Sequence, residues 1–147
     1  MINGIGRSMG LANSGRVGMV VLLACSSTAQ ATISAWWDAG GASTSWANTT
    51  NWNTVADGSG GDPATVPTTG DTATFNTSPL NAPTTVTTAA LSIGGLVFNN
   101  TETTFIDGTA NAAITLGSGG LVIRDGAGAV TIGTTVTGHR LSFTLGA

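Results

Sequence analysis

Basic side chains are nearly absent from this sequence, which has four arginines and no lysine. A nucleic-acid partner is therefore not expected, because phosphate binding needs a basic face, and an anionic membrane surface is not expected for the same reason. The chain also has one cysteine and one histidine. A disulfide framework is thereby excluded, and so is a metal site built from histidine and cysteine.

The first acidic residue is Asp38, and before it the chain carries only the positive charges of Arg7 and Arg16. An apolar run, Val17–Cys25, follows these arginines and is too short to cross a bilayer as a helix. Small residues then lead to Ala29-Gln30-Ala31. A positive start, a short apolar run and an A-x-A exit are typical of a secretory signal peptide.

Residues 1–31 are thus predicted to be a signal peptide cleaved after Ala31, which would leave a secreted or cell-surface protein without a transmembrane span. Leu22-Leu23-Ala24-Cys25 resembles a bacterial lipobox. Lipid attachment to Cys25 is therefore the alternative to simple cleavage.

The mature chain, residues 32–147, is acidic and rich in threonine. It holds seven acidic residues against Arg124 and Arg140, has 25 threonines and contains only one glutamate. Threonine favours strands, and glycines at short intervals interrupt any helical pattern. The sequence therefore predicts an all-β protein.

Two segments differ in composition. Residues 32–90 contain all the tryptophans and prolines, whereas residues 91–147 show short apolar alternations closed by glycine. The alternating segments are Leu91–Gly94, Ile114–Gly117, Val130–Gly133 and Leu141–Phe143, and a second pair is Gly95–Phe98 and Gly120–Ile123. Strands of three to five residues at a period in the twenties predict a solenoid of incomplete repeats, with a β-sandwich as the alternative.

The order of several short motifs adds a family resemblance. They are Trp36-Trp37, Asn51-Trp52, Pro67, Gly70–Phe75, Ile93–Asn100, Ile114–Gly117 and Gly120–Ile123. This order resembles the start of bacterial proteins with autotransporter-associated β-strand repeats. The resemblance implies a right-handed parallel β-helix, the N-terminal portion of an adhesin-like surface or secreted passenger, and it supplies no catalytic residues.

Catalysis and cofactor binding are not predicted. His139, the single histidine, is expected in a solvent-exposed turn, although Thr137–Arg140 faintly resembles a step of β-helical pectinases. Asp57 and Asp62 are the closest carboxylate pair for glycoside hydrolysis or calcium binding, but they lie in a Gly/Ser loop that is expected to be solvated.

The four tryptophans, Trp36, Trp37, Trp46 and Trp52, are the main functional lead. Buried, they would cap the first rung of a β-helix; exposed, they would form a glycan-binding face. We expect the cap, and hence a non-catalytic structural protein, with a carbohydrate-binding module as the alternative and a piece of a polysaccharide enzyme as a weaker one.

The segment Leu141–Leu145 reads as a strand with no cap after it. An uncapped rung leaves backbone groups and apolar side chains unpaired. We therefore expect either further β-helix repeats or self-association through this open C-terminal rung.

Overall fold

The computed structural model describes residues 32–78, 80, 82–137 and 139–146, which belong to one compact unit spanning residues 31–147. The predicted signal peptide, with the cleavage point after Ala31 and the alternative lipid site at Cys25, lies outside these residues. In the described part of the chain, strands dominate and the helical structure is a short 3-10 turn, η1, at Thr49–Asn51. The all-β prediction is confirmed.

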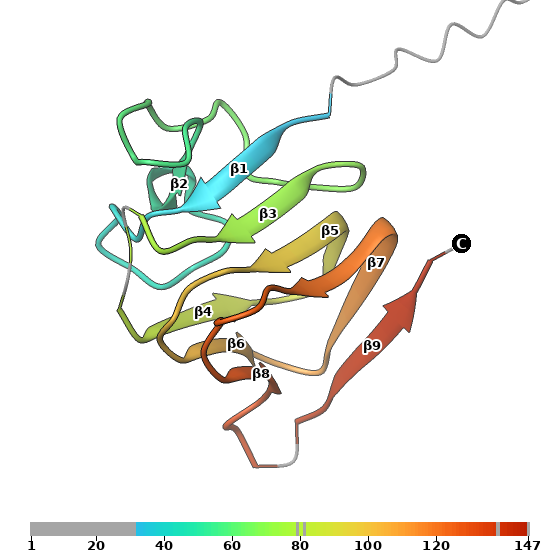
Figure 1. The fold of residues 1–147 in the computed structure, drawn as a ribbon. Helices are drawn as coiled ribbons and strands as arrows, with labels where there is room; N and C mark the ends of the chain where they lie inside the picture. The colour runs from blue at the N-terminus through green and yellow to red at the C-terminus, as the bar shows by residue number, and fades with distance from the viewer. Residues whose placement is uncertain (1–31, 79, 81, 138, 147) are drawn as a thin grey trace, which may run out of the picture. The chain divides into compact units, whose positions relative to one another are not determined.

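A first sheet, called sheet A, combines strands from both compositional segments (Figure 1). Its order is β2-β1-β3-β5-β7-β9. The strands are β1 (Ser34–Trp37), β2 (Trp52–Asn53), β3 (Thr72–Phe75), β5 (Leu91–Phe98), β7 (Ala112–Ile123) and β9 (Leu141–Leu145). Neighbouring strands pair in parallel from β1 through β3, β5 and β7 to β9, whereas β2 is antiparallel to β1.

A second sheet, sheet B, contains the strands that alternate with those of sheet A along the chain. These are β4 (Thr84–Thr88), β6 (Thr104–Gly108) and β8 (Val130–Gly133), paired in parallel in the order β4-β6-β8. From β3 to β9 the chain therefore passes from one sheet to the other and back. Each strand pairs with the strand two places later, which lies in the same sheet.

Alternation of buried and more exposed side chains within strands such as β6 builds the core between the two sheets. In β6, Thr104, Ile106 and Gly108 are buried while Phe105 and Asp107 are half-buried, as expected for side chains that point to opposite faces. Parallel pairing in register then places like residues on successive strands, and we call each such set a column. One column is Trp37, Phe75, Phe98 and Ile123, and another is Ala35, Ala73, Leu96 and Leu121.

The strands that contain the repeated sequence motifs are longer than expected. Leu91–Gly94 and Gly95–Phe98 are the two halves of β5, and their counterparts at residues 114–117 and 120–123 both lie in β7. The prediction of strands limited to three to five residues is therefore wrong here. Backbone pairing continues through the glycines, with a register shift between Ile93 and Gly95.

Gly94 is required where these strands change direction. A Cβ at this position would lie 2.5 Å from the carbonyl carbon of Gly70 and 2.6 Å from the oxygen of Asp71. β5 therefore passes so close to the backbone of Gly70 and Asp71, just before β3, that a side chain at position 94 has no space.

The other two alternating segments take different places. Val130–Gly133 forms β8 in sheet B and pairs with β6. β9 pairs with β7 so that Phe143, rather than Leu141, is opposite Ile114. The same apolar-Thr-apolar pattern thus serves both sheets, because a half-buried strand needs that alternation wherever it lies.

Candidate functional site

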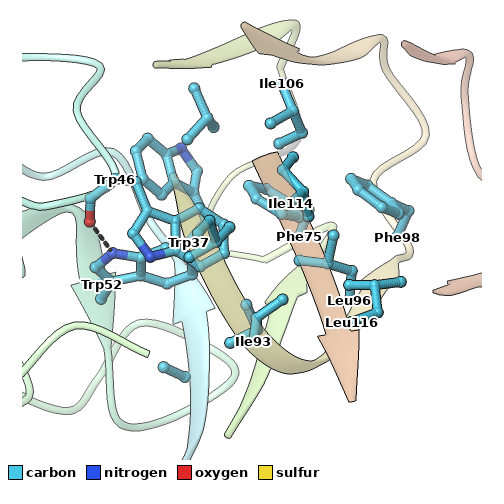
Figure 2. Packing of buried hydrophobic residues seen from close by; sticks show 14 residues of the cluster. Trp37, Trp46, Trp52, Phe75, Ile93, Leu96, Phe98, Ile106, Ile114 and Leu116 are labelled. Atoms are coloured by element: carbon cyan, nitrogen blue, oxygen red, sulfur yellow. Dashed lines mark hydrogen bonds between the residues drawn. The ribbon is translucent and has the colours of Figure 1, made fainter. Parts of the chain in front are cut away.

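Three of the four tryptophans, with two phenylalanines, form the aromatic end of the core (Figure 2). Trp37, Trp46 and Trp52 are 1%, 4% and 0% exposed, and Trp36 is half-buried. The Trp52 ring lies 5.0 Å from that of Trp37 and 4.6 Å from that of Trp46, both in edge-on geometry. Phe75 lies 6.1 Å from Trp52, so the indoles pack directly on the columns of sheet A.

Each buried indole N–H has an acceptor. Trp52 Nε1 donates to the Trp46 carbonyl at 3.0 Å, the bond drawn in Figure 2. Trp46 Nε1 donates to the Pro67 carbonyl at 3.2 Å, and Trp37 Nε1 donates to Thr84 Oγ1 at 3.2 Å. Burial with satisfied polar atoms is the environment of a structural tryptophan.

Both sheet edges nearest these indoles are covered. β2 pairs with β1 through Trp36 opposite Asn53 and Trp37 opposite Trp52. On sheet B, the Trp46 N–H donates to the Thr87 carbonyl at 2.8 Å, and the Thr87 N–H donates to the Thr44 carbonyl at 2.8 Å. We call β1, β2 and the loop of residues 38–71 the closed end.

Two buried asparagines hold the loop of the closed end in place. Asn51 accepts from the Gly41 N–H at 2.9 Å and donates to the carbonyls of Ser43 and Ser45 at 2.8 Å each. Asn53 donates to Gly58 and Gly60 carbonyls and to Asp38 Oδ2, at 3.1–3.2 Å. These two buried amides pair with backbone groups of a loop that has little regular secondary structure of its own.

Asp71 fixes the start of β1. Its Oδ1 accepts from the Ile33 N–H at 2.9 Å, and its Oδ2 accepts from the N–H and hydroxyl of Thr68 at 2.8 and 3.2 Å. Sequence reasoning assigned no role to Asn51, Asn53 or Asp71. The available signal for Asn51 and Asp71 was their position within the motifs Asn51-Trp52 and Gly70–Phe75, which carried the family resemblance, whereas Asn53 lies outside both motifs.

The burial of three tryptophans narrows the set of residues that could form the alternative glycan-binding face. Sugar stacking needs an exposed indole face, and Trp37, Trp46 and Trp52 offer none in this structure. A glycan contact therefore stays a prediction for Trp36 alone, whose position in β1 pairs with Thr74. A hollow of about 510 Å³ also adjoins the loop, lined by Trp46, Pro67, Leu91 and neighbouring threonines and alanines.

His139 differs from the expectation. Its N–H donates to the Val136 carbonyl at 3.1 Å, so it does lie in a turn, but the residue is half-buried. Its Nδ1 is enclosed and has no partner among the described residues. The predicted turn is present, and its exposure is partial at His139; the neighbouring Arg140 N–H donates to Asn111 Oδ1 at 2.8 Å, which ties this turn to the residue preceding β7.

The acidic pair is solvent-exposed at both positions, Asp57 and Asp62. Hydrogen bonds from the Ser59 side chain and backbone lower the pKa of the Asp57 carboxyl below its ordinary value of 3.8. A general acid would need the opposite shift. Among the described residues there is no group of three or more His, Cys, Asp or Glu side chains placed to hold a metal ion.

The described residues include no helix that is long and apolar enough to span a membrane. The chain matches no family model, no curated protein and no solved structure.

Proposed function

We propose that this chain is a non-catalytic structural protein of an exported, adhesin-like or stalk-like kind, built as a capped right-handed parallel β-helix. The observation that carries the proposal is the continuity of the columns. Leu91, Ile114 and Phe143 are in register over three strands of sheet A, as are Val86, Ile106 and Ile132 in sheet B. Stacked rungs of this kind bury a core that no single rung could bury alone.

Parallel pairing also separates this proposal from the alternative fold. A β-sandwich of the common type pairs its strands antiparallel, whereas successive strands of sheet A from β1 onward run parallel. Crossover connections between parallel strands of the same sheet are almost always right-handed, which favours a right-handed winding of the chain.

The polar interior supports a scaffold role. Asn51, Asn53, Asp71 and Asn100 are the buried amides and carboxylate, and each has hydrogen bonds that close a turn or loop. The resemblance to autotransporter-associated β-strand repeats supports the same role, because most of its segment Ile93–Asn100 lies in β5 and its segment Gly120–Ile123 lies in β7, the strand paired with β5. Export is proposed from the sequence of residues 1–31.

The fold is tested by cross-strand NMR contacts in the labelled chain. We expect parallel-sheet contacts between Leu96 and Leu121 and between Phe105 and Thr131. Antiparallel contacts between the same segments would overturn the β-helix.

The role of the tryptophans is tested by fluorescence. We expect blue-shifted emission that is weakly quenched by iodide and unchanged by added glycans. A quench or shift on glycan addition that disappears in Trp36→Phe would favour the carbohydrate-binding module. N-terminal sequencing of secreted material tests export, with Thr32 as the expected first residue.

A further inference from the structure

One segment of the closed end, residues 62–66, makes no hydrogen bond within the part of the chain that the structure describes. It follows the Gly/Ser loop and contains no strand or helix. Asp62, Ala64 and Thr65 are exposed, whereas Pro63 is buried. Exposed backbone without hydrogen bonds is the part of a domain that best tolerates a break in the chain.

The chain is held firmly on both sides of this segment. Before it, the N–H and the hydroxyl of Thr54 both donate to the Gly61 carbonyl, at 3.1 and 3.0 Å, and so close the Gly/Ser loop. After it, the Pro67 carbonyl accepts from Trp46 Nε1 at 3.2 Å. A break within residues 62–66 would therefore leave short free ends on an otherwise intact fold.

The carboxylate of Asp62 differs from those of most other aspartates. Among the described residues none donates a hydrogen bond to it. Asp125 shares this property, but glycine follows Asp125 whereas proline follows Asp62. Hydrogen bonds occupy the carboxylates of the remaining aspartates, Asp38, Asp57, Asp71 and Asp107.

The proline restricts what this carboxylate can do. Pro63 has no N–H, so its nitrogen cannot attack the Asp62 side chain to form an imide, a reaction open to Asp125-Gly126. The carboxylate can instead attack the carbonyl carbon of Asp62 itself. The new C–O bond closes a cyclic anhydride, the C–N bond to Pro63 breaks, and the nitrogen leaves as a secondary amine with a proton from acidic solvent. Water then opens the anhydride to carboxyl groups, so the net reaction is hydrolysis.

We propose that the peptide bond between Asp62 and Pro63 is a site of acid-driven self-cleavage, and that the cut chain stays folded as associated pieces. The cut would turn the cap of the closed end from a covalent part of the chain into a separate polypeptide bound to β3 and β4. This inference goes beyond the proposed structural role and does not depend on the winding of the β-helix.

The contacts across the cut explain why the pieces remain together. The piece that ends at Asp62 carries Trp37, Trp46 and Trp52, which are 1%, 4% and 0% exposed. Its strand β1 pairs with β3 of the other piece over residues 34–37. The Trp46 N–H also donates to the Thr87 carbonyl of the other piece at 2.8 Å.

Mass spectrometry of the full chain, incubated from about pH 7 to about pH 3, tests the cut over the range that includes the titration of aspartate carboxyls. We expect fragments that end at Asp62 and begin at Pro63, formed in acid and not at neutral pH. Asp62→Ala should slow their formation at least about tenfold, because the nucleophile is lost. Asp57→Ala removes another exposed carboxylate of the closed end and, as the matched control, should be cut like the wild type.

Size-exclusion chromatography of the cut chain at neutral pH tests the association. We expect the pieces to elute together with unchanged circular dichroism and to separate only in denaturant. An uncut chain at every pH, equal cleavage in Asp62→Ala, faster cleavage after Asp71 or Asp107, or pieces that separate in native buffer would overturn the proposal. The NMR contacts between Leu96 and Leu121 would still stand in each case, so this failure is distinct from failure of the β-helix.

Discussion

The two ends of the same columns have opposite surroundings. At the closed end, Trp37 and Ala35 begin their columns and are 1% and 0% exposed, because the loop of residues 38–71 folds over them. At the opposite end, formed by β8, β9 and residues 120–123 and called the open end, the same columns reach Ile123 and Leu121, which are 55% and 41% exposed. Apolar side chains in one register thus differ in exposure because of what lies beyond them.

This difference shows what a cap requires. Apolar side chains alone are insufficient, since the open end has them. The closed end adds a partner for each sheet edge and internal amides for the loop, such as Asn51 and Asn53. A cap in a parallel sheet is therefore a problem of hydrogen bonding as much as of hydrophobic burial.

The largest effect is expected from breaking the closed end at Trp52. Trp52→Ala removes a 0% exposed indole that contacts Trp37 and Trp46, and should lower the free energy of unfolding by about 3–5 kcal/mol. Half-buried Trp36→Ala is the control and should cost clearly less. Denaturant unfolding followed by circular dichroism measures both, and equal losses would contradict the cap.

Substitutions at Leu96 and Leu121 compare the buried and the exposed part of one column with the same residue type. Leu96→Ala should lower the free energy of unfolding by about 2–5 kcal/mol because Leu96 is fully buried. Leu121→Ala should cost less than half as much, because Leu121 is 41% exposed. Equal losses on denaturant unfolding would show that Leu121 is covered as fully as Leu96.

A substitution at Gly94 tests how closely β5 packs on the backbone of Gly70 and Asp71. Gly94→Ala places a methyl group 2.5 Å from the Gly70 backbone and should lower the free energy of unfolding by about 1–3 kcal/mol. A methyl group at Gly61 would meet no atom within 4 Å, so Gly61→Ala should change it by no more than about 0.5 kcal/mol. Indistinguishable thermal transitions for the two variants would argue against the close packing of β5 on Gly70 and Asp71.

The smallest effect is expected in the exposed loop of the closed end. Because hydrogen bonds from Ser59 lower the pKa of Asp57, its contribution to stability is present above pH 3.8 and is lost as the pH falls through the lower, folded pKa. NMR titration of the Asp57 carboxyl should give a midpoint below 3.8, and Ser59→Ala should raise it. A wild-type midpoint at or above 3.8 would refute the Ser59 contact.

The sequence allowed the all-β class to be predicted and similar strand segments to be recognised. Gly95–Phe98 and Gly120–Ile123 stood out as similar segments, and they pair residue for residue. The sheet to which Val130–Gly133 belongs could not be predicted, because apolar alternation is the same in either sheet. The bonds of Asn51 were equally hidden, since its partners are backbone atoms placed only by the folded loop.

The bonds of Asp71 have a consequence for the protein under mechanical load. Ladder hydrogen bonds in both sheets run from strand to strand, so a pull on the C-terminal side would peel β9 from β7 a few bonds at a time. A pull on the N-terminal side meets the Asp71 carboxylate, which holds the Ile33 N–H, and the parallel pairing of β1 with β3. A tether that enters through residue 32 would therefore pull on a strand paired along both edges, whereas one attached beyond β9 would pull on a strand paired along one edge.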